Sequence, residues 1–197
     1  MTGSTALGTS ILKALLTRGD IGHMFCLNRS PDGGRAAQER RFSTAGLGAD
    51  LLDESRVTFL AADPSKPTLG LSHEMYRPLG TRVGLILHNA WPVNFNPGLP
   101  AFRVQLTGLV NLLTLAATAT PQPMRTMFNS SVGAVAGLKP GAPAPESVPS
   151  ESVALGASAG RIYGYSRSKL LAELLRDAVS GSLQMPVGIA RVGQVAG

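Results

Sequence analysis

The order in which short apolar runs, small polar residues and helical segments follow one another constrains the fold most. The apolar runs predicted to be strands are residues 24–27, 57–61, 83–87, 126–128 and 187–190. Continuous apolar strands are typical of parallel sheets, whose two faces are both covered by helices. The predicted fold is therefore α/β with a doubly wound parallel sheet, and ligands of such sheets bind at the carboxyl ends of the strands.

The segments between these strands carry helical patterns. Helices are predicted over residues 9–16, 35–47, 72–79, 99–118 and 165–180, and a long loop rich in Pro, Gly, Ser and Ala over residues 138–160. A loop of that length in a compact domain is often a lid or a binding loop. The chain has 197 residues and no internal repeat, so a single domain is expected.

Composition narrows the function classes. The formal charge is +6, but the basic residues are scattered without interleaved aromatic residues, so nucleic acid is not expected as a partner. An anionic cofactor or an acidic protein partner explains the charge at least as well. No apolar run suggests a membrane span, no signal-peptide pattern begins the chain, and no membrane partner is expected. Cys26 is the single cysteine, which excludes an internal disulfide and favours a cytoplasmic location.

Tyr165 and Lys169 lie four residues apart in the last predicted helix and therefore share one of its faces. A nearby ammonium favours the phenolate, so Lys169 would lower the pKa of Tyr165 from its ordinary value of about 10 toward neutrality. Such a tyrosine can act as a general acid at physiological pH. The pair alone also fits an ordinary surface pair on a helix. The glycine-rich turn and the paired serines that precede the pair favour the catalytic interpretation.

Several residues that follow predicted strands have side chains suited to a cofactor or a substrate. Arg29 follows the first strand, where an arginine accommodates the 2′-phosphate of NADP, although it also fits a solvated loop. Asp63 follows the second strand and could accept a hydrogen bond from an adenine amino group or cap the turn. Ser130 and Ser131 follow the fourth strand, where a serine can donate to a substrate carbonyl or simply form a turn. His88, after the third strand, is expected to be structural.

The first eight residues, MTGSTALG, predict a glycine-rich turn that leads into a helix, the geometry that receives a pyrophosphate. Gly3 and Gly8 would let the backbone approach the phosphates, and the small hydroxyl residues add donors. The spacing departs from the dinucleotide-binding fingerprint, because the outer glycines are one residue too close and the middle glycine is absent. Taken alone, the stretch is better explained as an ordinary helix start rich in Gly and Ser.

Together these pieces resemble the extended short-chain dehydrogenase/reductase family. Within that family they look most like the thioester reductase domains of carboxylic acid reductases, adenylate-forming reductases and aminoadipate reductases. The resemblance covers essentially the whole chain. It is carried by residues 26–30 (CLNRS), 63–65 with 70–71, 88–96 (HNAWPVNFN), 164–169 (GYSRSK) with Glu173, and 191–194 (RVGQ). The spacing of Tyr165 and Lys169 is common to the whole superfamily, whereas the HNAW stretch is typical of a much smaller group of proteins within it.

The resemblance implies an NAD(P)-binding Rossmann fold and the catalytic residues Ser131, Tyr165 and Lys169. In that set Tyr165 donates the proton, Lys169 lowers its pKa and holds the nicotinamide ribose, and Ser131 orients the carbonyl, with Ser130 as its alternate. NADPH is the implied cofactor, and the residues implied to bind it are Gly3, Ser4, Thr5, Leu7, Gly8, Arg29, Asp63, Asn89, Ala90, Trp91, Ser130, Tyr165, Lys169, Val192 and Gly193. The implied reaction reduces an acyl thioester to an aldehyde or further to an alcohol, and an acyl-loaded phosphopantetheinyl carrier protein or carrier domain presents the substrate.

The chain departs from the family pattern at the shortened glycine turn and at Gln105, where many relatives carry an asparagine. The first strand and the C-terminal substrate region are also expected to be missing, so residues 1–197 would form a partial domain. The first strand lies in the centre of such a sheet, and its absence would leave the backbone groups of two neighbouring strands unpaired. We therefore expect the isolated chain to be marginally stable or unfolded unless another segment takes the place of that strand. Two alternatives stay open: another extended-family reductase or epimerase acting on a free small molecule, and a non-catalytic truncated remnant.

Overall fold

The computed structural model describes residues 1–3, 6–138, 143–146 and 163–194. Its strands are β1 (Met24–Asn28), β2 (Val57–Ala61), β3 (Leu85–His88), β4 (Arg125–Ser131) and β5 (Val187–Val192). β1 pairs with β2, and β4 lies between β3 and β5, with every pair parallel. Thr2 forms single parallel bridges with Leu27 of β1 and His88 of β3, so it joins the two groups of strands. The predicted α/β fold with a parallel sheet is confirmed.

The helices follow the predicted order with shifted ends. They are α1 (Ala6–Leu16), α2 (Arg35–Thr44), α3 (His73–Arg82), α4 (Arg103–Ala117) and α6 (Gly164–Leu183). Short 3₁₀ turns are η1 (Ala49–Leu52), η2 (Pro67–Gly70), η3 (Leu99–Phe102) and η4 (Val132–Val135). Most of the predicted 138–160 loop lies outside the described residues.

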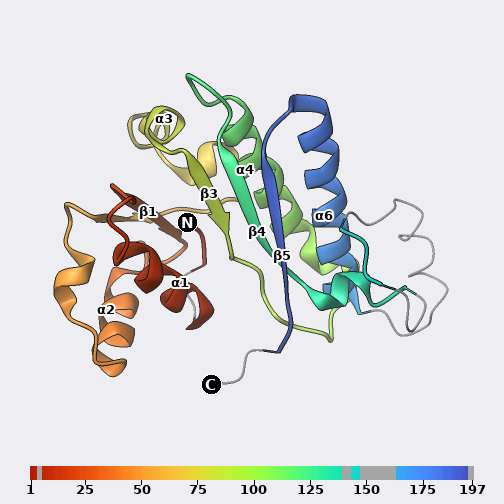
Figure 1. The fold of residues 1–197 in the computed structure, drawn as a ribbon, viewed down its shortest axis with the longest axis horizontal. Coiled ribbons are helices and arrows are strands. Elements are labelled where there is room, and N and C mark those ends of the chain that lie inside the picture. The colour runs from red at the N-terminus through yellow and green to blue at the C-terminus, as the bar shows by residue number, and fades with distance from the viewer. Residues whose placement is uncertain (4–5, 139–142, 147–162, 195–197) are drawn as a thin grey trace.

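Two hydrophobic clusters lie on opposite faces of the sheet. Met24 and Cys26 of β1 pack with Leu12 of α1 and Phe42 of α2. Leu27, the next residue of β1, belongs to the second cluster, which α4 and α6 supply. Figure 1 shows α4 and α6 side by side along β4 and β5, while α1 and α2 lie together near β1. Because neighbouring strand residues point to opposite faces, this alternation shows that the sheet is covered from both sides.

The segment Leu99–Ala117 corrects the expectation that no apolar run is long enough to cross a membrane. Its length and its mean hydropathy of 1.3 would allow a span. In the structure, however, it divides into η3 and α4, and Leu109, Leu112 and Ala116 are buried in the core against the sheet. The segment therefore serves as a core helix in this fold.

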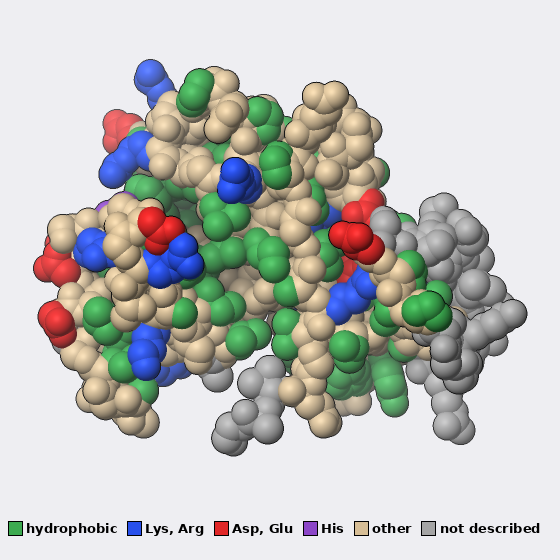
Figure 2. All heavy atoms as spheres, viewed as in Figure 1, with side chains coloured by type: hydrophobic (Ala, Val, Ile, Leu, Met, Phe, Trp, Pro, Cys, Tyr) green, Lys and Arg blue, Asp and Glu red, His purple; other side chains and the backbone are tan. Residues whose placement is uncertain are grey.

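The slot expected for a central first strand is present but partly filled. Thr2 donates to the Leu87 carbonyl at 2.9 Å and accepts from the Asn89 amide at 3.1 Å, as a residue of a central strand would. Beyond Met1 a cavity of about 600 Å³ continues between β1 and β3. Figure 2 shows hydrophobic side chains gathered across the middle of this face, where β3 and β4 lie, and Leu85 of β3 is 43% exposed. Met1 and Thr2 therefore lie between β1 and β3 in the way that the end of a central strand would.

Candidate active site

Tyr165 is positioned by the close approach of α6 to the segment after β3. Gly164, the first residue of α6, lies so near the backbone of residues 97–99 that a Cβ there would be 2.4 Å from the Gly98 carbonyl carbon. The Tyr165 ring is then packed edge-on against Phe95, with centroids 5.0 Å apart, and the residue is 6% exposed. Trp91, which also follows β3, stabilises the contact with α6, because its indole Nε1 donates a hydrogen bond to Ser168 at 3.1 Å.

The catalytic serine predicted from the sequence is Ser131, and the structure separates it from Ser130. The prediction that both serines leave the end of the strand is wrong, because β4 continues through Ser131. Neighbouring strand residues face opposite ways, so the two hydroxyls have different partners. Ser131 hydrogen-bonds the side chain of Tyr165, whereas Ser130 is buried and donates to Glu173. The structure therefore brings Ser131 together with Tyr165.

Lys169 lies in an aromatic and carbonyl cage. Its ammonium donates to the Asn129 carbonyl at 2.6 Å and lies 4.7 Å from the centre of the Trp91 ring and 4.5 Å from that of Phe128. Such cation–π contacts stabilise the charge inside a low-dielectric site. Burial nevertheless lowers the pKa of Lys169 to about 7, and the opposing charge of Glu173 raises it in part. This lysine can change its charge near neutral pH.

The expected lowering of the Tyr165 pKa is not found. Burial raises the pKa of the phenol above 10, and the hydrogen bond from Ser131 offsets only part of that rise. The ammonium of Lys169 is held by Asn129 and by aromatic rings, which explains why it does not dominate at the phenol. Tyr165 is therefore protonated at neutral pH, the state that a proton donor needs.

The glycine turn is packed tightly against the end of β3 despite its shortened spacing. Gly3 has φ +77°, and a Cβ on it would lie 2.6 Å from the Ala90 nitrogen, so this position requires glycine. A Cβ on Gly8 would lie 2.0 Å from the Gly3 carbonyl oxygen. Asn89 donates to that oxygen at 2.8 Å. Leu7 lies in the first turn of α1, and Ser4 and Thr5 lie outside the described residues.

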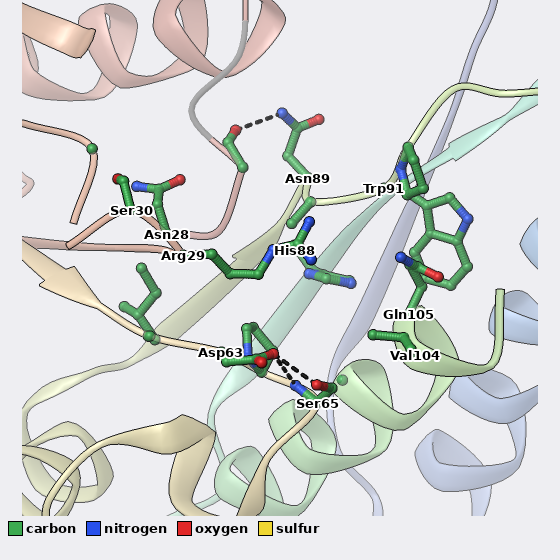
Figure 3. Close-up of a pocket in the computed structure, with 18 of the residues that line it drawn as sticks. Asn28, Arg29, Ser30, Asp63, Ser65, His88, Asn89, Trp91, Val104 and Gln105 are labelled. Carbon is green, nitrogen blue, oxygen red and sulfur yellow. Dashed lines mark hydrogen bonds between the residues drawn. The ribbon is translucent and has the colours of Figure 1, made fainter. Parts of the chain in front are cut away.

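A cavity of about 400 Å³ opens where the strands end, next to this turn (Figure 3). Six residues predicted to bind a cofactor line it, namely Gly3, Arg29, Asp63, Asn89, Ala90 and Trp91. Val192 and Gly193 lie elsewhere on the same edge, since Val192 pairs in register with Ser131. Two buried polar atoms of the lining residues, Nε2 of His88 and Oε1 of Gln105, have no partner among the described residues.

Arg41, which was not predicted to bind a cofactor, lines the cavity together with Arg29. The signal was available in the spacing of Ala37 and Arg41, which lie four residues apart on one face of α2 and both line the cavity, as does Gly34 at the N-cap. Gln105 and Gly108, three residues apart on α4, close the opposite wall. Two guanidinium groups, the glycine cradle and the unpartnered polar atoms fit a phosphorylated dinucleotide.

The family model NAD_binding_4, described as "Male sterility protein", matches residues 1–197. The chain belongs to this family. The family supports a nicotinamide cofactor, and the cavity at the strand ends is the part of the chain that suits one.

Named relatives agree with the family. The chain is 34% identical over 199 residues to a carboxylic acid reductase of Neurospora crassa, covering 100% of this chain and 18% of that protein. It is 31% identical over 202 residues to the adenylate-forming reductase Nps10 of Heterobasidion annosum, again covering 100% and 18%. The chain therefore spans about a fifth of the length of these relatives.

Two solved structures share the fold. The terminal R domain of the myxalamid PKS-NRPS pathway superposes with a TM-score of 0.79 at 28% identity, covering 100% of this chain and 48% of that one. The reductase domain of a nonribosomal peptide synthetase from Mycobacterium tuberculosis gives a TM-score of 0.77 at 25% identity, covering 98% and 46%. The chain thus spans about half the length of these two structures.

Proposed function

We propose that this chain is the cofactor-binding and catalytic part of an NADPH-dependent, cytoplasmic reductase that converts an acyl thioester on a phosphopantetheinyl carrier protein into an aldehyde. The observation that carries the proposal is the meeting of Ser131 and Tyr165 beside buried Lys169, at the strand edge that also holds the cavity. Relatives that are carboxylic acid reductases and nonribosomal-peptide-synthetase reductase domains support a substrate at the carboxyl oxidation level.

NADPH, rather than NADH, is supported by the two arginines of the cavity. Arg29 and Arg41 would hold the 2′-phosphate, because guanidinium groups pair with phosphate oxygens by charge-assisted hydrogen bonds. Asp63, which already accepts from Ser65 at 2.7 Å, would accept from the adenine amino group. Gly3 and the N-terminus of α1 would face the pyrophosphate.

Each catalytic side chain would have a separate role in the reduction. The nicotinamide, when bound, supplies the hydride. The Ser131 hydroxyl orients the thioester carbonyl, and Tyr165 holds a proton for the oxygen that becomes negative. Lys169, whose ammonium donates to the Asn129 carbonyl and lies 5.8 Å from the centre of the Tyr165 ring, would hold the ribose. Loss of the carbon–sulfur bond then releases the aldehyde and the free thiol of the carrier.

The test is aldehyde formation from an acyl-pantetheine thioester with NADPH by the intact protein. Tyr165→Phe keeps the ring packing but removes the proton, so we expect turnover to fall by about 10²- to 10⁴-fold. Tyr163→Phe, at an exposed tyrosine two residues away, is the matched control and should keep turnover. Reduction of a free ketone or conversion of a nucleotide sugar, with no action on the thioester, would favour the other extended-family enzymes instead.

A further inference from the structure

We propose that Glu173 is a positioning residue of this active site, whose buried carboxylate fixes the serine end of β4 and supplies the countercharge for Lys169. The inference rests on the proposed function for its catalytic meaning. Its structural content rests on contacts that exist without substrate or cofactor.

Glu173 is connected to both strands that form the catalytic edge. Its carboxylate accepts a hydrogen bond from Ser130, the neighbour of Ser131 on β4. It also accepts from Arg191 of β5, with Nη2–Oε2 at 2.8 Å and Nε–Oε2 at 3.1 Å. Because Ser131 is the next residue after Ser130, a movement of the carboxylate would move the catalytic hydroxyl. Glu173 therefore holds the serine in its place relative to α6.

Glu173 lies on the same face of α6 as the catalytic pair. It follows Lys169 by four residues and Tyr165 by eight, a spacing that repeats at each helical turn. The sequence reading used Glu173 only as part of the family resemblance, although this spacing already placed it beside the site. Its side chain is fully buried.

Glu173 is the carboxylate whose charge acts on Lys169, whereas Asp177 and Glu173 both act on Arg176. Within the described part of the chain, Glu173 is the one acidic residue in the buried set, which also holds the cations Lys169 and Arg176. Arg191 adds a third cation with 16% of its side chain exposed. A buried cation without a countercharge is costly, so Glu173 raises the share of Lys169 that is an ammonium near neutral pH.

Arg191 extends the network to a further segment. Its Nη1 donates to the Pro145 carbonyl at 2.5 Å, and its Nη2 donates to the Glu146 carbonyl at 3.2 Å. The carboxylate thus orients an arginine that holds residues 145–146 over β5. Other charged or titratable groups that face Lys169 or its neighbours are Tyr165, Arg176 and Asp177 of α6, His88 of β3, and the amino group of Met1 through His88.

The test follows the charge of Lys169 in the full chain by NMR of 13Cε-labelled lysine, since the sequence has only four lysines. Lys169→Met assigns the signal. We expect the parent to titrate with a pKa of about 7. In Glu173→Gln the shape is kept and the negative charge is lost, so the midpoint should fall by about one pH unit. A variant that merely loosened the site would admit water and raise the midpoint, so a fall is specific to the lost charge.

Three further variants complete the test. Glu173→Asp keeps the charge, so the titration midpoint of Lys169 should stay close to that of the parent. Glu39→Gln, in the exposed pair with Arg35, should not shift the midpoint. Arg191→Gln leaves Glu173 less neutralised and should raise the midpoint; it decides the matter if Glu173→Gln does not fold. An unchanged or raised midpoint in folded Glu173→Gln, or an unchanged one in Arg191→Gln, would overturn the proposal.

The activity assay separates this proposal from the proposed function. If both hold, the alkaline limb of the pH profile for thioester reduction moves to lower pH in Glu173→Gln by the same amount as the NMR midpoint. If the chain reduces no thioester, the NMR result still decides the role of Glu173.

Discussion

His88 shows how a single buried residue sets the response of this chain to acid. Its Nδ1 is 2.6 Å from the Thr2 hydroxyl, and its ring stacks on Phe128 with centroids 5.7 Å apart. Burial, with help from the positive charges of Lys169 and Arg176, lowers its pKa from 6.5 to about 3. The structural role expected for His88 from the sequence agrees with these contacts.

Between pH 6.5 and 3 the unfolded chain binds one proton more than the folded chain at this residue, so the free energy of unfolding falls as pH falls. The full effect is at most about 5 kcal/mol. We predict that His88→Gln, which does not titrate, loses less stability than the parent between pH 7 and pH 4, by roughly 2–3 kcal/mol. Urea unfolding at both pH values measures the difference, and equal losses in the two proteins would contradict it.

Arg41 allows cofactor selection to be tested at a single residue. We predict that Arg41→Ser weakens NADPH binding by about tenfold or more while NADH binding stays unchanged, because only NADPH carries the 2′-phosphate. Arg40→Ser is the matched control, since Arg40 is its neighbour in α2 but does not line the cavity. Calorimetric titration of the three proteins gives the comparison. An equal effect of both substitutions would mean that general charge, and not the site, binds the phosphate.

At the scale of the element, α6 carries two of the three predicted catalytic residues, Tyr165 and Lys169, and its first residue lies against the segment after β3. Gly164 lies against the backbone of residues 97–99, which cannot move aside like a flexible side chain. We predict that Gly164→Ala destabilises the fold by about 1–3 kcal/mol and lowers turnover by displacing Tyr165.

Gly181, near the other end of α6, provides the control. A Cβ there has no neighbour within 4 Å. Gly181→Ala should therefore be neutral or stabilise by up to about 1 kcal/mol through helix propensity. Thermal unfolding and turnover of both variants are the measurements. Equal Tm values and equal turnover for the two variants would contradict a docking of α6 through Gly164.

Elements were the most predictable level of this structure. β2 was predicted to the residue, and β1, β3 and β5 within two residues at each end, because apolar runs bounded by polar residues mark strands directly. β4 was predicted too short, because Asn129, Ser130 and Ser131 are polar and fit a turn equally well when read locally. Their pairing with β3 and β5 keeps them in the strand, and no local signal shows that.

The sequence predicted six of the residues that line the cavity, but not the contacts that couple the residues of the site. Spacing placed Tyr165 and Lys169 on one face, and strand ends placed Arg29 and Asp63 in the cavity. The direction of the Tyr165 pKa depends on burial, and the partner of Ser130 depends on how α6 lies over β4. Both are properties of the packed fold.

At the scale of the whole molecule, β1 and β3 are joined through Met1 and Thr2, beside a cavity. The Met1 amino group is buried there beside the Phe25 carbonyl, and burial lowers its pKa. Phe25 and Leu85 border a cavity of about 600 Å³ that a strand could fill. The expectation that the isolated chain is only marginally stable therefore remains a prediction, and a cooperative thermal transition at an ordinary mesophilic temperature would contradict it.

Filling the slot should reverse this weakness. We predict that five apolar residues joined ahead of Met1 raise the Tm by several degrees, since about 1 kcal/mol corresponds to roughly 2–4 °C in a chain of this size. Five Gly and Ser residues are the control for length and for removal of the buried charge. Equal Tm values for the two extensions would show that the slot does not accept a strand.

The whole account depends on the chain binding a phosphorylated nicotinamide cofactor with its shortened glycine turn. Calorimetric titration of the 197-residue chain with NADPH, and in parallel with NADH, tests this most directly. We predict that NADPH binds and that NADH binds at least about tenfold more weakly, because Arg29 and Arg41 line the cavity. Binding of neither cofactor by the folded chain would contradict the account and favour a remnant that keeps the catalytic residues without their chemistry.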